Sequence, residues 1–333
     1  MIRSILLASC VILSLVACRS PQSQTSASNA SASENCQTVQ HQAGETQVCG
    51  QPQRIVVLNP KMLDILLSLG VQPIGYAEVF SNRQGNFDRP SQQIPYLGDR
   101  IREPIASLGI SGTPSLETLS RLKPDLILGD SAGNKEEYAQ LSQIAPTLLF
   151  EYVGENKWQE PLQTTAKVLD RTEQAEAIIQ AYQQELEAAR QALAPVVEAR
   201  PRVLMVASQQ VGQTIELVTP ADFCGGMTED LGFQLVLPSG TQAENITQNI
   251  SLEVLQQLDA DLIVVQGYDL ARLSQIQDTS KFEDDQLQAV RQTWNTNSIT
   301  RSLKATQEDR VFFLSTYLCR GLPSPIGAQL ILK

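Results

Sequence analysis

The sequence has little histidine, few aromatic residues and too few basic residues to balance its acidic ones. His41 is the one histidine in 333 residues, and aromatic residues make up 5% of the chain. Sites for bare zinc or manganese combine several histidines with carboxylates, so this chain is poorly equipped for them. The formal net charge is -11, from 25 Lys and Arg against 36 Asp and Glu. This balance argues against a nucleic-acid partner, which needs a basic face.

Common enzyme motifs are also missing. The sequence has no Gly-rich loop at a strand-to-helix turn in the Rossmann or P-loop pattern, and no Cys-x-x-Cys. The segment ADFCGGMTED places Cys224 before two glycines, but a cysteine nucleophile needs a histidine base, and only His41 exists. The sequence therefore favours a non-enzymatic protein without a cofactor.

The apolar run near the N-terminus is too short to span a bilayer comfortably. A short basic start with Arg3 leads into apolar residues 5–16, and Leu-Val-Ala then precedes Cys18. This pattern resembles the lipobox of bacterial lipoproteins, which implies a signal peptide over residues 1–17 and lipid on Cys18. An ordinary secretory peptide with an incidental cysteine is the alternative. Residues 18–35 are rich in Ser, Ala, Gln and Asn, which predicts a disordered tether for an extracytoplasmic, membrane-anchored protein.

Export makes disulfides permissible among the four cysteines that follow Cys18. Four cysteines allow three pairings. Cys36 and Cys49 flank QTVQHQAGETQV, whose alternation is typical of a hairpin, so we predict that these two pair. Cys224 and Cys319 then remain as the second pair. Free buried thiols are the alternative.

Strand-like and helix-like segments alternate along the rest of the chain. RIVVLNP is an apolar run closed by a turn signal, and KMLDILLSLG has helical spacing with a terminal glycine. This alternation predicts a parallel sheet covered by helices, and the order starts again at PRVLMVAS. Between the halves, residues 172–194 lack Gly and Pro and carry one apolar stripe. They predict a single helix of roughly 35 Å.

One stretch of the chain occurs twice. PSLETLSRLKPDLILGD in the first half returns as ISLEVLQQLDADLIVVQ in the second, so that Glu117 corresponds to Glu253. Each copy predicts a helix followed by a strand, with Thr113 and Asn249 as the capping residues. Each glutamate then lies in the first turn, where the helix dipole stabilises a carboxylate by about 0.3–1 kcal/mol.

The lipobox, RIVVLNP, both copies, the long helix and a final RGLPSPIGAQLIL together resemble the substrate-binding lipoproteins of ABC importers for iron-siderophores, heme and cobalamin. The resemblance covers nearly everything after Cys49. It implies two Rossmann-like lobes with mostly parallel sheets, joined by one long rigid α-helix. The first lobe with its hairpin would span residues 36–156, the connecting helices 157–199 and the second lobe 200–333. A shallow cleft between the lobes would hold the cargo.

The resemblance also implies partners. In that family, one exposed glutamate on each lobe meets an arginine pocket on each permease subunit, and Glu117 and Glu253 match these by position. The chain would act as a monomer that delivers cargo to an ABC permease dimer with its ATPase, touching the membrane only through its lipid. Stabilisation of the two helix dipoles alone is the competing interpretation of both glutamates.

Ligands of open α/β sheets bind at the carboxyl ends of the strands, which defines the candidate binding residues. The first lobe offers Asn59, Phe80, Arg100, Arg102, Ser131 and Asn134. The second lobe and its approach offer Trp158, Gln209, Phe223, Tyr268, Tyr317 and Arg320. As alternatives, Phe80, Phe223 and Tyr268 are core residues and Arg102 is a solvated surface charge.

Arginine beside aromatic rings suits an anionic ferric siderophore or ferric citrate, with no metal held by the protein directly. Cobalamin, which aromatic and polar contacts alone can hold, is an alternative cargo. Heme is another, although it would lack a histidine ligand and would need a tyrosine. A lipid-anchored structural or adhesion module without a small ligand is the alternative from another class.

Overall fold

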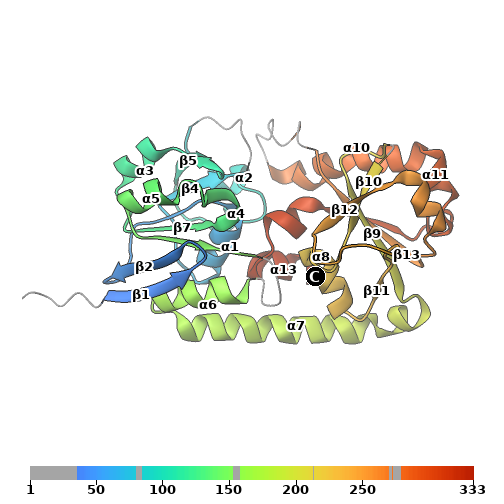
Figure 1. The fold of residues 1–333 in the computed structure, drawn as a ribbon, viewed down its shortest axis with the longest axis horizontal. Helices are drawn as coiled ribbons and strands as arrows, with labels where there is room; N and C mark the ends of the chain where they lie inside the picture. Colours follow the sequence, from blue (N-terminus) through green and yellow to red (C-terminus); the bar gives the residue numbers. More distant parts are fainter. Residues whose placement is uncertain (1–35, 80–84, 153–157, 213, 270–271, 273–278) are drawn as a thin grey trace, which may run out of the picture. The chain divides into compact units, whose positions relative to one another are not determined.

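The computed structural model describes residues 36–79, 85–152, 158–212, 214–269, 272 and 279–333. The predicted signal peptide, tether and lipid-bearing Cys18 lie outside the described residues, as does Phe80. Two sheets, each flanked by helices, account for most of the described chain, and a separate hairpin precedes them (Figure 1). The hairpin strands β1 (Cys36–His41) and β2 (Gly44–Cys49) pair antiparallel, with Cys36 opposite Cys49.

The first lobe is built on a six-stranded sheet with the strand order β6-β5-β4-β3-β7-β8. All neighbouring strands are parallel except β6, which runs antiparallel to β5. The strands are β3 (Ile55–Val57), β4 (Gly75–Glu78), β5 (Ala106–Ile110), β6 (Thr113–Pro114), β7 (Leu126–Asp130) and β8 (Thr147–Phe150). Every residue of β3, β4, β7 and β8 is buried, as expected for apolar runs in a sheet covered on both faces.

Short helices connect these strands. They are α1 (Pro60–Ser68), α2 (Pro90–Gln93), η1 (Gly98–Arg100), α3 (Leu116–Leu122), α4 (Ser131–Asn134) and α5 (Tyr138–Ile144). Helix α1 begins at Pro60, one residue before the predicted segment KMLDILLSLG, because the Asn59 side chain accepts the Met62 N–H and Pro60 occupies the first turn.

The second lobe also has a six-stranded sheet, in which β9, β13 and β14 are parallel neighbours. Strands β10 and β12 extend the other side of β9 in antiparallel fashion, and β11 pairs with β9 in parallel. The strands are β9 (Arg202–Ser208), β10 (Thr214–Val218), β11 (Gln234–Leu235), β12 (Thr247–Ser251), β13 (Leu262–Gly267) and β14 (Val311–Ser315). Its helices are α8 (Phe223–Asp230), η2 (Leu252–Gln257), η3 (Thr279–Lys281), α10 (Phe282–Thr296), α11 (Ser298–Ser302), α12 (Lys304–Gln307), η4 (Tyr317–Gly321) and α13 (Pro325–Leu332).

Helices α6 (Gln159–Val168) and α7 (Thr172–Ala199) connect the two sheets. Helix α7 has 28 residues and therefore spans roughly 42 Å. It continues past the predicted end at Ala194 and carries Pro195 within it. Figure 1 shows α7 running beneath both sheets, with α6 and the C-terminal helix α13 packed on it.

A second contact joins the lobes at the start of α13. Both carboxylate oxygens of Asp64, in α1, accept hydrogen bonds from the backbone N–H groups of Ile326 and Gly327, at 3.0 and 2.9 Å. The Ser324 hydroxyl donates to the carbonyl of Lys61 at 3.4 Å. Helix α13 is thus hydrogen-bonded to α1, the first helix of the first lobe.

The copied stretch forms a helix and then a strand in both lobes, but the caps differ from the prediction. Thr113 lies in β6 and Asn249 in β12, so neither caps a helix. The repeated serine stands at the helix start instead: the Ser115 side chain accepts the Thr118 N–H, whereas Ser251 precedes η2 without a side-chain bond. The second copy is a short 3₁₀ helix rather than an α-helix.

The aspartates of the copied stretch, Asp125 and Asp261, perform the same structural task. The Asp125 carboxylate accepts the N–H groups of Gln53 and Arg54, both at 2.8 Å, just before β3. Asp261 accepts the N–H of Arg202 at 3.0 Å, at the start of β9. Each aspartate therefore accepts hydrogen bonds from backbone N–H groups at the beginning of the neighbouring parallel strand, and these groups would otherwise lack an acceptor.

Candidate functional site

A pocket of about 500 Å³ lies between the two lobes. The first lobe contributes residues from the start of α1 and from the carboxyl ends of β7 and β8. The second lobe contributes the start of α8 and the η4 helix that follows β14. The position at strand ends agrees with the general rule for ligand sites in open α/β sheets.

On the first-lobe side, Lys61 faces Asp130 and Tyr152. The Lys61 ammonium is 3.2 Å from Asp130 Oδ2 and 4.9 Å from the centre of the Tyr152 ring, an ion pair and a cation–π contact. The other oxygen of Asp130 accepts the N–H of Gly133 at 2.7 Å, which caps α4. Burial, followed by the charges of Asp130 and Asp64, raises the pKa of Tyr152 well above its usual range, so this phenol is neutral.

On the second-lobe side, Arg320 is held by the carboxylates of Glu216 and Asp222. Its Nη1 lies 3.1 Å from Glu216 Oε2, and its Nε lies 3.2 Å from Asp222 Oδ2. Glu216 also accepts the Tyr268 hydroxyl at 3.0 Å. Burial and the Glu216 charge raise the pKa of Tyr268, while Arg320 opposes the shift.

Asp222 is positioned by the segment that contains the two glycines after Cys224. Its Oδ1 accepts the N–H groups of Cys224 and Gly225, at 2.9 and 3.3 Å, and the Gln266 amide at 3.2 Å. A side chain at position 225 would place its Cβ 2.1 Å from the carbonyl oxygen of Thr219, so only glycine permits this tight turn into α8.

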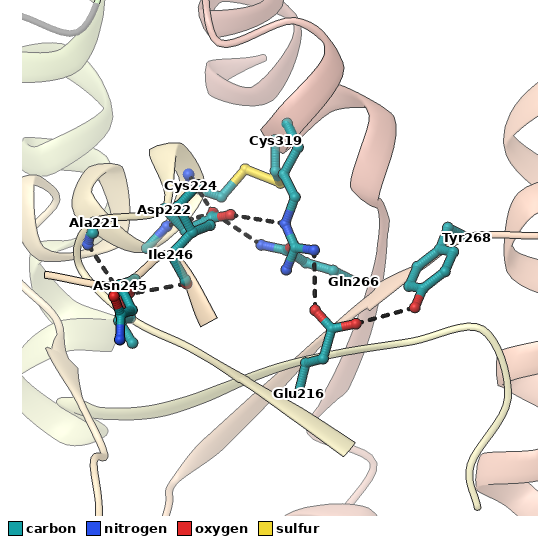
Figure 2. A network of polar contacts seen from close by, with 12 residues as sticks. Glu216, Ala221, Asp222, Cys224, Asn245, Ile246, Gln266, Tyr268 and Cys319 are labelled. Carbon is teal, nitrogen blue, oxygen red and sulfur yellow. Dashed lines mark hydrogen bonds and ion pairs between the residues drawn. A yellow bond between two sulfur atoms is a disulfide. The ribbon is translucent and has the colours of Figure 1, made fainter. Parts of the chain in front are cut away.

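Both predicted disulfides are present: Cys36 bonds to Cys49 and Cys224 to Cys319. The second one joins α8 to η4 directly beside Asp222 (Figure 2), the partner of Arg320. Asp222 and the two sulfur atoms lie within 4.8 Å of one another, but the sulfurs are bonded to each other and are therefore not thiolate ligands. The same bond removes Cys224 as a nucleophile.

An aromatic cluster forms a further contact between the lobes. Tyr96 of the first lobe stacks on Tyr317 at 6.1 Å between ring centres, and Phe282 meets both rings edge-on. Tyr96 has φ 61°, a left-handed conformation that is unusual for a bulky residue.

Burial and then the Glu78 charge raise the pKa of Tyr76 and of Tyr317 well above the usual range. These phenols are therefore neutral hydrogen-bond donors beside a buried carboxylate.

A sequence profile of the periplasmic binding protein family matches residues 55–318 of the chain. The chain belongs to this family.

Individual relatives agree with this membership. The Fe(3+)-citrate-binding protein YfmC of Bacillus subtilis (strain 168) is 29% identical over 315 residues, which cover 93% of this chain and 87% of YfmC. The Fe(3+) dicitrate-binding periplasmic protein FecB of Escherichia coli (strain K12) is 38% identical over 130 residues, 39% of this chain and 40% of FecB. The crystal structure of Staphylococcus aureus SirA complexed with staphyloferrin B superposes with a TM-score of 0.68 at 23% identity, covering 89% and 96% of the two chains. This last likeness establishes the fold.

Within this periplasmic binding protein, some predicted ligand residues lie in the pocket. Ser131 and Arg320 line it, and Phe223 does so as well. Tyr268 supports Glu216 behind Arg320, and Tyr317 belongs to the aromatic cluster.

Other predicted residues lie elsewhere in the described structure. Asn59 caps α1, and Asn134 is fully buried and donates to the Ser111 carbonyl. Trp158 is 1% exposed and packs edge-on against Tyr182 of α7. The remaining candidates are Arg100 and Arg102, which are exposed, and Gln209, which is half-buried and does not line this pocket.

Several pocket residues were missed from the sequence. Asp130 ends β7, and Lys61 lies in the first turn of the helix that follows β3, so their positions were a usable signal for the first-lobe side. Asp222 and Glu216 gave no such signal, because they reach Arg320 across 98 and 104 residues of sequence. Only the folded chain shows that the arginine is already paired.

The two glutamates of the copied stretch are both exposed in the first turn of their helices. The side chain of Glu117 is 89% exposed and lies 3.6 Å from Arg121 one turn along α3. Glu253 begins η2 in the second lobe. Of the helices that the structure describes, none is long and apolar enough to cross a membrane.

Proposed function

We propose that this protein is the substrate-binding component of an ABC importer. It captures an iron(III)-siderophore or a ferric-citrate-like complex between its lobes and delivers it to a membrane permease. The observation that carries the proposal is the pocket at the strand ends of both lobes, in a chain of the periplasmic binding protein family. The ferric citrate ligands named for YfmC and FecB support the choice of cargo.

The way the lobes are joined supports a site that is largely formed before the cargo arrives. Helix α7, the Asp64 bonds to α13, and the contact of Tyr96 with Tyr317 connect the lobes at separate places. A pocket that is held open in this way needs little rearrangement, so little of the binding free energy is lost to ordering.

Retention of iron by the full-length protein tests this function. The protein is mixed with ferric hydroxamate, ferric catecholate and ferric citrate, and with heme and cobalamin as competing cargo classes, and bound iron or cobalt is measured after ultrafiltration. Metal retention is a better readout than tryptophan fluorescence, because Trp158 and Trp294 are 1% and 0% exposed and do not line the pocket.

A pocket-filling variant shows whether retained iron lies in this site. Ala132 is exposed and lines the pocket, so Ala132→Trp places an indole in it. We expect it to reduce retention at least tenfold, whereas the matched Ala192→Trp on the exposed face of α7 leaves retention unchanged. Retention of heme or cobalamin alone, or of no probe at all, would contradict the proposed cargo.

We also propose that Cys18 carries the lipid anchor and that Glu117 and Glu253 dock the two lobes on the permease. Two exposed first-turn carboxylates, one per lobe, suit a partner built from two subunits. Labelling with a palmitate analogue is expected to mark the wild type and not Cys18→Ser, and equal labelling of both would end the anchor proposal.

A further inference from the structure

We propose that the pocket selects ferric chelates of zero or positive net charge over strongly anionic ones. This inference rests on the proposed function and concerns the class of chelate. It differs from the sequence-based expectation that Arg320 attracts an anionic cargo, because the folded chain pairs this guanidinium with two carboxylates.

Charges of the two signs balance around the pocket. Three basic side chains and three acidic side chains are present among its described lining residues: Lys61, Lys135, Arg320, Asp130, Glu151 and Asp222. Glu216 adds one more negative charge directly behind Arg320. A cavity that binds a multiply charged anion needs an excess of positive charge, and this described lining has none.

Two of the three cations are already neutralised by internal partners. Lys61 is paired with Asp130, whose side chain is 10% exposed. Arg320 is paired with both Asp222 and Glu216, so the local charge around this guanidinium is negative. Lys135 has no ion pair among the described residues, and the exposed Glu151, which also lines the pocket, carries the opposite charge.

The acidic partners are fixed in place. The Asp222 side chain is 0% exposed and is held by the N–H groups of Cys224 and Gly225 and by Gln266. A cargo anion that drew Arg320 away would break its ion pair with this buried carboxylate, and breaking a buried ion pair is strongly unfavourable. Asp130 is held in the same manner by the N–H of Gly133.

The remaining lining suits a chelate whose outer surface is organic and uncharged. Tyr152, Phe223, Ile246 and Pro323 contribute aromatic and aliphatic surface, and Ser131 and Gln42 contribute neutral polar groups. Three hydroxamates around Fe(III) give a neutral complex, and a free amine on that chelator makes it cationic. Three catecholates give a triply negative complex, and this lining has no excess positive charge to offset it.

Equilibrium dialysis with three ferric probes tests the charge preference. They are a neutral trihydroxamate, an amine-bearing trihydroxamate and a tris-catecholate, each measured against the full-length protein at low salt. We expect the neutral and cationic probes to bind at least tenfold more tightly than the triply negative one, because charge repulsion near a protein surface is of that order.

The variant Glu216→Gln then removes one negative charge without changing the side-chain shape. Its amide oxygen still accepts one hydrogen bond of the network, so the fold is retained. We expect it to raise the affinity for the tris-catecholate roughly tenfold and to change that for the neutral probe less than about threefold. Glu187→Gln is the matched control, since Glu187 also pairs with an arginine at 2.8 Å, but on the exposed face of α7.

Two results would overturn this inference while leaving the proposed function intact. One is that the wild type binds the tris-catecholate as tightly as the neutral probe. The other is that Glu216→Gln and Glu187→Gln have the same effect. If no ferric probe is retained by any of the proteins, the proposed function itself fails, and the charge preference fails with it.

Discussion

Asp64 is a fully buried carboxylate that joins the two lobes. It lies inside α1, and its two oxygens accept the first free N–H groups of α13, where the helix dipole also favours a negative charge. Burial is nevertheless the larger effect and raises the pKa of Asp64 from 3.8 to about 7, against the lowering by Ile326 and Gly327. Ionisation of Asp64 in the folded protein therefore reduces the free energy of unfolding.

This raised pKa predicts a stability that falls as pH rises from about 4 to about 7. The folded state binds the Asp64 proton more tightly than the unfolded state. The protonated side chain therefore contributes its full stabilisation below the unfolded pKa of 3.8, and this stabilisation is lost as the pH rises to the folded pKa of about 7. The loss is roughly 4 kcal/mol, because each pKa unit corresponds to about 1.4 kcal/mol. Urea unfolding at several pH values measures it.

The variant Asp64→Asn should lack this pH-dependent fall. It should also be less stable than the wild type at pH 4, by about 1–3 kcal/mol, since an amide N–H then faces a backbone N–H of α13. Because the wild type loses roughly 4 kcal/mol between pH 4 and pH 7, the difference shrinks as pH rises and then reverses, so that Asp64→Asn is the more stable protein near pH 7. Asp284→Asn is the control for loss of a carboxylate, because Asp284 is 84% exposed. An unchanged pH dependence in Asp64→Asn would assign the effect to another group.

At the scale of elements, the copied stretch shows which parts of a repeated sequence are structural. Ser115 and Ser251 stand at the helix starts. Asp125 accepts backbone N–H groups just before β3, and Asp261 accepts the first one of β9. The serine and aspartate repeats thus follow from the local geometry of a helix that enters a parallel strand. The repeated glutamate takes part in neither task, which leaves it available for a partner.

Loss of either disulfide is expected to lower the free energy of unfolding, by a different amount for each. Replacing Cys224 and Cys319 by alanine opens a link across 95 residues, and the chain-entropy estimate for its loss is roughly 4–5 kcal/mol. Replacing Cys36 and Cys49, 13 residues apart, is expected to cost roughly 3 kcal/mol. Denaturant unfolding measures both.

Only the variant that lacks Cys224 and Cys319 should also impair retention of ferric chelate, because this disulfide positions Asp222 and Arg320. The hairpin variant serves as its control. Equal retention by both variants, at a temperature where each is folded, would show that the link is unnecessary for the site.

At the scale of the whole molecule, docking and cargo binding are expected to be separable. Glu117→Ala and Glu253→Ala should leave ferric-chelate affinity almost unchanged and reduce uptake in cells, with the double variant the most affected. Loss of one charge at an interface leaves the opposite charge without its ion-pair partner, and this costs about 2 kcal/mol or more of binding free energy when the pair is buried.

Glu173→Ala provides a matched control for the docking prediction. Glu173 is also an exposed first-turn glutamate, at the start of α7. Its loss should cost only about 0.3–1 kcal/mol of helix stabilisation and leave uptake normal. Normal uptake by a stable, ligand-competent double variant would leave helix stabilisation as the role of both docking glutamates.

The sequence by itself determined the elements whose signals are local. Apolar runs predict β3 and β9, the uninterrupted amphipathic stretch predicts α7, and the alternating segment between Cys36 and Cys49 predicts their pairing. These signals are local because strand burial, helix periodicity and hairpin register depend on neighbours within a few residues.

The tertiary structure decided what the side chains of the site do. Trp158 was predicted to contact ligand but packs on α7, and Arg320 was predicted as an available charge but is paired with Glu216 and Asp222. Both outcomes depend on residues far away in the sequence. Because electrostatic and packing partners are chosen in space, the charge that a pocket presents to its cargo is a property of the folded chain.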